Sequence, residues 1–436
     1  MTGQTTSNGA SGSNKHETTV GITGYGAVVE SGGDSHKGMV SMERQHGNSW
    51  WETLSTIFKG VVGSGILALP VAFKETGLAL GTICLLIFAV ISLYTHRIII
   101  LTIQALRKKQ LGGPDGRIEY QDLSRYTFGW LGEAISAFSM ITTQLGGCVS
   151  FLVFIAENMR DVTGVSVVNV MFCLFPVLTL MALIKDGSLF AGTSHLGNLA
   201  LILAISTVFW YGFSHSPPSS DLSSYTHFRP HGLPIFFGIG VYTFSAHCEV
   251  VFIEQSMKKR SEFLSVLTSA FVAITALYLA FGALCYMFFG DQTSEIIFEN
   301  LGTSNFVLFV KVCICVALLV QYPLVLLPAT TTIEDLLKAK ESMVWSNIVR
   351  ILLVAFTVFL AIAIPSFEVV TSFVGAFSNG VVAFVLPPLC YLAHAPNLGS
   401  LEKCFNYGLA VFGVVASVYS SIVVLACVFQ PNASVC

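Results

Sequence analysis

Eleven apolar stretches follow one another along this chain, and each reaches or nearly reaches the length that crosses a lipid bilayer. They fall at residues 51–76, 78–105, 130–157, 164–184, 196–214, 234–255, 263–290, 303–329, 344–365, 367–393 and 404–429. A helix needs about 20 apolar residues to span the hydrocarbon core. The stretches are too long, and too uniformly apolar, for the alternating strands of a membrane barrel. The sequence therefore predicts an all-α membrane protein with eleven transmembrane helices.

The composition excludes the soluble classes of protein. Hydrophobic residues make up 53% of the chain and charged residues only 11%, whereas a soluble domain carries about 25% charged residues. The formal net charge of -3 offers no basic field to nucleic acid. No H-E-x-x-H, Cys-x-x-Cys or P-loop pattern occurs. We therefore expect neither an enzyme nor a metal or other cofactor, and the lipid bilayer is the expected surrounding.

The two ends of the chain are predicted to lie on opposite sides of the membrane. Residues 1–50 contain 23 Gly, Ser or Thr residues and no signal peptide, which predicts a disordered tail. With this tail in the cytoplasm, the inner loops and helix ends hold thirteen Lys and Arg residues, and the outer loops hold only Arg160 and Arg229. An odd number of helices places residues 430–436 outside as a short extracytoplasmic tail, with Asn432 as a glycosylation candidate. The transmembrane domain is expected at 51–429, and the inner segment 113–127 is expected to include a short interfacial helix.

The first apolar stretch is interrupted near its middle by Gly60, Gly63, Ser64 and Gly65. A backbone that leaves the helical conformation inside a membrane needs partners for its polar groups, so such breaks occur where the backbone lines a cavity. The start of one half-helix offers N–H groups to a carboxylate, and the end of the other offers carbonyl groups to an ammonium or a cation. The alternative interpretation is close helix packing by small residues.

The sixth stretch has a matching irregularity, with two glycines followed by the run Phe244, Ser245, Ala246, His247, Cys248 and Glu249. The first and sixth helices occupy corresponding places in two five-helix halves, and the halves have opposite topology because five is odd. Paired interruptions at corresponding places indicate a transporter site at the interface of an inverted repeat.

Ionisable residues inside membrane helices are costly and mark functional sites by default. His247 is therefore our first candidate for proton coupling, because histidine titrates near physiological pH, and Glu249 is the second. The alternative for His247 is a buried neutral histidine bonded to a carbonyl. Gln144 in the third stretch is a candidate for the cavity wall. Tyr322 in the eighth could reach a substrate or could pack with a bonded hydroxyl.

Several segments resemble the amino acid/auxin permease family and are most similar to its animal proton-coupled amino acid transporter branch. The resemblance covers roughly residues 50–430. Its motifs are FKGVVGSGILALPVAFKETGLALG at 58–81, TQLGGCVSFLVFIAEN at 143–158, FFGIGVYTF at 236–244, IEQSM at 253–257 and the residues from Phe289 to Gln292. The segment at 143–158 is the most specific of these.

This resemblance implies a LeuT-like fold, in which two inverted five-helix repeats are followed by one extra helix and helices 1 and 6 are broken. It also implies small neutral amino acids as substrates, often moved with a proton. The backbone of Gly60, Gly63, Ser64 and Gly65 would then bind the charged groups of the substrate, and Phe244, Ser245 and Ala246 would line the other side. The chain departs from the branch at Ser245, where the branch has an acidic residue, and at His247, where it has apolar residues. Gln321 replaces the threonine of the sodium-coupled branch.

The expected function is secondary active transport of small neutral amino acids, coupled to protons, by alternating access around helices 1 and 6. One alternative is sodium coupling. Another is an amino-acid sensor that uses the same pocket and signals through partners of the N-terminal tail, which the sequence does not identify. The expected location is the plasma membrane or an endolysosomal or vacuolar membrane.

Overall fold

The computed structural model describes residues 47–111, 118–184, 193–219 and 221–429, which belong to one unit, Ser41–Cys436. Both predicted tails, apart from residues 47–50, lie outside this range, as does Asn432. The described chain is helical, with one isolated β-bridge between Asn48 and Met257. The main elements are α1 (Trp50–Val61), η1 (Ser64–Ala68), α2 (Leu69–Thr76), α3 (Leu78–Lys108), α4 (Tyr120–Thr163), α5 (Val167–Ala182), α7 (Thr193–His215), α8 (Leu233–Thr243), α9 (Glu249–Ser256), α10 (Phe263–Phe289), α11 (Asn305–Leu336), α12 (Met343–Ala363), α13 (Phe367–Val374), α14 (Leu386–His394) and α15 (Ser400–Phe429).

Each of the eleven predicted stretches coincides with a helix or with helices separated by a short break. Within the described residues, eight helices are long and apolar enough to cross a membrane, and a ninth span results if α1 and the segment Ser64–Thr76 are counted together. The other two stretches carry shorter helices. The 16 residues of α5 rise only about 24 Å, and the sixth stretch is divided between α8 and α9. An all-helical membrane protein is thus confirmed, whereas the count of eleven stays a prediction.

Two helices deviate from regular geometry for local reasons. Gly129 adopts a φ of 65° inside α4 and separates a short helix, which begins at Tyr120, from the long remainder. This short helix matches the one expected before the third stretch. Between α13 and α14 the chain forms the π-helical turns η8 (Gly375–Asn379) and η9 (Val381–Val385). Pro387 and Pro388 follow at the start of α14, and they lack the N–H groups that an α-helix needs to bond the carbonyls four residues earlier.

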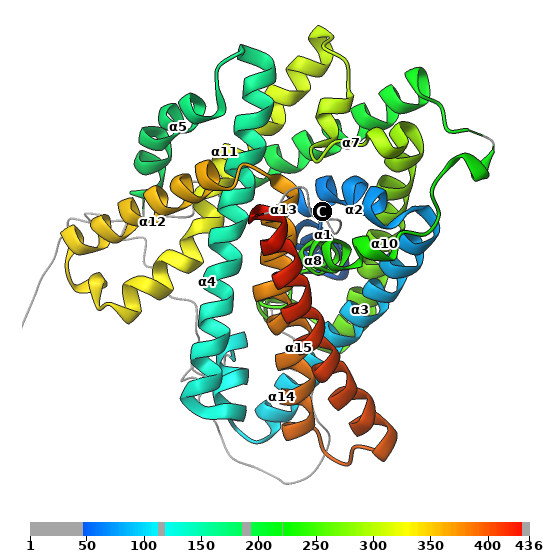
Figure 1. Cartoon of the computed structure of the whole chain (residues 1–436). Helices are drawn as coiled ribbons and strands as arrows, with labels where there is room; N and C mark the ends of the chain where they lie inside the picture. The colour runs from blue at the N-terminus through cyan, green and yellow to red at the C-terminus, as the bar shows by residue number, and fades with distance from the viewer. Residues whose placement is uncertain (1–46, 112–117, 185–192, 220, 430–436) are drawn as a thin grey trace, which may run out of the picture. The chain divides into compact units, whose positions relative to one another are not determined.

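The short helix α8 lies in the interior of the described unit, among the longer helices α3, α10 and α15 (Figure 1). Nine of its eleven residues are buried, and it packs against α2, α13 and α15. This packing is close because glycines face each other. A Cβ atom on Gly375 would lie 1.9 Å from the carbonyl oxygen of Gly238. In the interior of the unit, α8 therefore packs directly against the first turn of η8.

Candidate functional site

Two chain breaks meet in the interior. The first lies between the end of α1 at Val61 and the start of η1 at Ser64, where the two segments are bent by 45°. The second lies between the end of α8 at Thr243 and the start of α9 at Glu249. The Thr243 hydroxyl is 3.2 Å from the carbonyl oxygen of Gly65, so the two breaks are in direct contact.

The glycines explain why the first break forms and why the second can approach it. Gly63 is extended, with φ -117° and ψ -152°, and ends the helical path of α1. A Cβ atom on Gly65 would lie 3.0 Å from Cα of Thr243 and 3.3 Å from the ring of Tyr242. A larger residue at position 65 would therefore push η1 away from the end of α8. No such neighbour surrounds Gly63, where a Cβ would enter open space.

A cavity of about 160 Å³ lies where the breaks meet. Gly60, Gly63, Ser64 and Gly65 line it from the first break, Ser245 and Glu249 line it from the second, and Gln144 lines it from α4. Seven of the residues predicted as site candidates thus share one cavity. Their roles in binding stay predictions.

The other candidates in the described chain lie behind this lining. Phe244 stacks with the Phe271 ring at 6.2 Å and is buried. Ala246 and His247 are also buried and do not line the cavity. The unwound segment explains this difference, because successive residues there point in different directions. Ser245 faces the cavity while its neighbours face α3 and α10.

Tyr322 is buried away from the cavity, and its hydroxyl is hydrogen-bonded to the Thr357 hydroxyl at 2.7 Å. This contact agrees with the second interpretation of Tyr322, in which the side chain packs in the interior and its hydroxyl is hydrogen-bonded. Its neighbour Gln321 lines the cavity instead.

His247 lies against α3 and not against the cavity. Its Nε2 atom is 2.9 Å from the hydroxyl oxygen of Thr95. Glu249, at the start of α9, does line the cavity. The two proton-coupling candidates therefore face different surroundings, although they are only two residues apart.

Asn379, in the tenth apolar stretch, is a further cavity residue that is not among the predicted site candidates. It lies at the end of η8, is 1% exposed, and lines the cavity. The Thr143 hydroxyl donates a hydrogen bond to Asn379 Oδ1. This bond fixes the amide orientation and leaves the Nδ2 group without a partner among the described residues. π-Helical turns are frequent at functional sites, and the signal in the sequence was a short polar run inside an apolar stretch.

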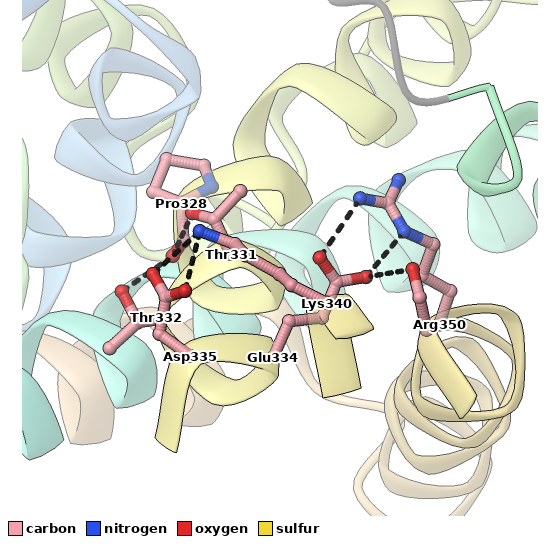
Figure 2. Close-up of polar contacts among 8 residues, drawn as sticks. Pro328, Thr331, Thr332, Glu334, Asp335, Lys340 and Arg350 are labelled. Atoms are coloured by element: carbon pink, nitrogen blue, oxygen red, sulfur yellow. Dashed lines mark hydrogen bonds and ion pairs between the residues drawn. The ribbon is translucent and has the colours of Figure 1, made fainter. Parts of the chain in front are cut away.

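A larger hollow of about 880 Å³ adjoins this cavity. Met140 and Cys248 line both. The larger hollow continues along the beginning of α4, past Trp130, and along the end of α11, from Pro328 to Leu336. Figure 2 shows this end of α11, where the hydroxyls of Thr331 and Thr332 donate hydrogen bonds to the carbonyl of Pro328 at 3.0 and 2.9 Å.

At the opposite end of α2 a loop is anchored by Arg229. The guanidinium group donates hydrogen bonds to Asp291 at 2.7 Å and to the carbonyl of Lys74 at 3.1 Å. The bond with Asp291 raises the pKa of the Arg229 side chain. The loop is therefore fixed to both α2 and the segment after α10.

Comparisons with known proteins agree with this architecture. A family model described as "Transmembrane amino acid transporter protein" matches residues 46–426. Amino acid transporter ANT1 of Arabidopsis thaliana is 27% identical over 398 residues, covering 85% of this chain and 90% of the relative. Amino acid transporter AVT3B of the same plant is 28% identical over 414 residues, covering 88% and 94%.

Among solved structures, a manganese transporter of Eremococcus coleocola superposes with a TM-score of 0.58 at 13% identity, covering 90% of this chain and 91% of that one. The nucleobase-cation-symport-1 family transporter Mhp1 gives 0.54 at 13% identity, covering 91% and 95%. These likenesses concern the fold alone and agree with the LeuT-like class. The family is one of transporters and not of enzymes. The chain belongs to the transmembrane amino acid transporter family, the amino acid/auxin permease family that the motifs predicted.

Proposed function

We propose that this protein is a secondary active transporter of small neutral amino acids, coupled to protons, that works by alternating access around two broken helices. The observation that carries the proposal is the cavity at which the α1–η1 and α8–α9 breaks meet. The names of the relatives, which are amino acid transporters, support the substrate class.

The cavity offers complementary groups to both ends of an amino acid. The segment Ser64–Thr76 begins at the cavity, and the first N–H groups of a helical segment have no partner within it and carry partial positive charge. The substrate carboxylate would bind there. The ends of α1 and α8 present carbonyl groups with partial negative charge, where the ammonium group would bind. The free Nδ2 group of Asn379 supplies a further donor.

The size of the cavity favours the smallest substrates. Its volume is about 160 Å³, and an apolar cavity of about 150 Å³ holds one benzene molecule. Alanine has as many non-hydrogen atoms as benzene. Glycine, alanine and serine are therefore the substrates that we expect to fit without a change in the cavity wall.

The larger hollow would serve as the route to one side of the membrane. It shares Met140 and Cys248 with the central cavity and lies next to Lys340, in the turn that follows α11. The positive-inside rule assigns this basic end to the cytoplasm. In this proposal the N-terminus is cytoplasmic, the C-terminus is extracellular or luminal, and the membrane is the plasma membrane or an endolysosomal or vacuolar one. His247 is the first candidate for the proton carrier in this proposal, and Glu249 is the second.

The test is uptake of labelled glycine, alanine, serine and leucine into proteoliposomes that contain the full chain. One set of vesicles has an imposed pH gradient and the other an imposed sodium gradient. We expect accumulation of the three small amino acids with the pH gradient alone. The Gly63→Val variant is the matched control, because its side chain would occupy the cavity and abolish uptake. Sodium dependence would overturn proton coupling, and saturable binding without flux would favour a sensor.

A further inference from the structure

Two buried histidines are stacked behind the α8–α9 break. His96 lies in the middle of α3, and its ring centroid is 3.8 Å from that of His247 with an angle of 33° between the planes. Both side chains are almost completely inaccessible, with 0% and 1% exposed. We propose that His96 and His247 together form one proton-binding site that holds a single proton, and that this site carries the coupling proton. The inference rests on the proposed proton-coupled transport and adds His96 as its second residue.

Hydrogen bonds determine which ring nitrogens carry the protons when both rings are neutral. Nδ1 of His96 is 2.7 Å from the carbonyl oxygen of Ser92, which can only accept, so this nitrogen bears a hydrogen. The Thr95 hydroxyl donates to the same carbonyl at 3.0 Å. It therefore accepts from Nε2 of His247 at 2.9 Å, and this nitrogen bears the hydrogen of the second ring.

This arrangement leaves one lone pair on each ring. Nε2 of His96 and Nδ1 of His247 are buried and make no hydrogen bond of good geometry within the described residues, although the carbonyl of Ala246 lies close to the His96 ring. A neutral imidazole with an unpartnered basic nitrogen is ready to accept a proton. Two imidazolium rings at 3.8 Å would repel each other strongly in a medium of low polarity, so the pair accepts one proton and not two.

Of the two described helices beside the pair, α10 brings no charged side chain, and the charged side chains of α3 are exposed or paired. α10, which contributes Phe271 at 4.9 Å from the His96 ring, contains no charged residue between Phe263 and Phe289. On α3, Arg97 is exposed, and Arg107 forms an ion pair with Glu254 of α9.

Further titratable groups lie on the elements that pack against α3, among them Lys74 and Glu75 at the end of α2. Glu249, at the start of α9, lines the substrate cavity and is the nearest carboxylate to the pair in sequence. On α14, His394 is 3.1 Å from the hydroxyl of Thr127. Protonation of the pair is thus separate from the ion pairs that hold the helices together.

The pair also contacts the segment that forms the cavity wall. The Ser92 hydroxyl donates to the carbonyl of Phe244 at 3.4 Å, and His247 is two residues after the cavity residue Ser245. A proton from the aqueous phase would bind one of the two free nitrogens and give the unwound segment a new donor and a positive charge. Release to the other side would restore the neutral rings. The state of the pair is therefore transmitted to the α8–α9 break without any covalent step.

The test compares the wild type with His96→Gln, His247→Gln and the double variant in proteoliposomes, with His394→Gln as the control. Two activities are measured: accumulation of alanine driven by a pH gradient, and alanine exchange at equal pH on both sides. We expect both single variants and the double variant to lose accumulation to the same extent, at least tenfold, while exchange remains. Residues that act as one unit give such non-additive losses. The control should accumulate alanine as the wild type does.

Accumulation by His96→Gln at the wild-type level, or losses that multiply in the double variant, would overturn the pair as one site. Failure of the proposed function looks different, because the wild type itself would then show no accumulation in a pH gradient. Thr95→Val gives a second measurement if the histidine variants do not fold. It keeps the side-chain shape but removes the acceptor of His247 Nε2, so the pH midpoint of uptake should shift to lower pH. An unchanged midpoint in that variant would contradict the proposal.

Discussion

The hydroxyl of Tyr278, in the middle of α10, lies 2.9 Å from the carbonyl oxygen of Val61, the last residue of α1. The same hydroxyl is 3.2 Å from the carbonyl oxygen of Thr243, the last residue of α8. One side chain thus connects the ends of both half-helices. The carbonyl groups at these ends have no helical partner, and in a membrane interior each unsatisfied group is costly.

Replacement of Tyr278 by Phe should therefore destabilise the protein. The variant leaves two buried carbonyls without this donor, and we expect the free energy of unfolding to fall by about 1–3 kcal/mol. Thermal denaturation of the purified protein in detergent measures the change. Tyr286→Phe is the control, because Tyr286 is as deeply buried as Tyr278 but its hydroxyl makes only longer contacts, at 3.3 and 3.5 Å. Equal losses in the two variants would contradict a special role for Tyr278.

Two glycines of the first break should respond differently to a single added methyl group. In Gly65→Ala the new Cβ meets the backbone of Thr243 at 3.0 Å, and such overpacking costs about 1–3 kcal/mol. In Gly63→Ala the Cβ meets open space at the cavity. We expect Gly63→Ala to keep the melting temperature of the wild type and to reduce uptake, and Gly65→Ala to lower both. A loss of stability in Gly63→Ala would show that this position is structural.

Neighbouring threonines of α4 provide a matched pair for the role of Asn379. Thr143 holds the Asn379 amide, whereas the Thr142 hydroxyl bonds only to the carbonyl of Phe138, within its own helix. Thr143→Val removes the hydroxyl that fixes this amide at the cavity wall, so the amide is free to rotate. We expect the KM for alanine to rise about three- to tenfold, in line with the loss of one hydrogen bond. Thr142→Val should stay within about twofold, and an equal rise in KM would disprove the orienting role.

Much of the fold could be predicted from the length and apolar character of the eleven stretches, because the bilayer allows few alternatives to a helix. Gly60, Gly63 and Gly65 are crowded into six residues of an apolar stretch, and they predict an interruption in the region where α1 ends and η1 begins. The same argument predicts an interruption in the sixth stretch, which carries α8 and α9. That these are the broken helices of a transporter stays a prediction. The short α5 and the π-helical turns were not predicted, since they depend on proline positions and on packing between distant helices.

The cavity residues could be predicted only in part. Ser245 and Glu249 both line the cavity, but the direction of each side chain in an unwound segment does not follow a helical period. Phe244 and Ala246 therefore lie behind the lining. Gln321 and Tyr322 point to different sides of the helix α11, and which side faces the cavity depends on how distant helices pack. The contact of His96 with His247 joins residues 151 positions apart, and no pattern within either stretch indicates it.

The end of α11 carries two adjacent acidic residues with different environments (Figure 2). Glu334 accepts hydrogen bonds from Arg350 Nε at 2.8 Å and from the Ser346 hydroxyl at 2.7 Å. The side chains of the Arg350–Glu334 pair are 5% and 4% exposed. Asp335 pairs with Lys340 at 2.6 Å, but both side chains are more than half exposed.

Glu334→Gln should consequently cost about 3 kcal/mol or more of stability, because it leaves the Arg350 charge buried without its partner. Asp335→Asn should cost less than about 1 kcal/mol, as expected for an exposed ion pair. Thermal denaturation in detergent compares the two variants. A double variant, Glu334→Leu with Arg350→Met, should be less destabilised than Glu334→Gln, because it removes both charges and retains apolar packing. Equal melting temperatures of the two single variants would show that the buried ion pair contributes no more to the stability of the helix end than the exposed ion pair.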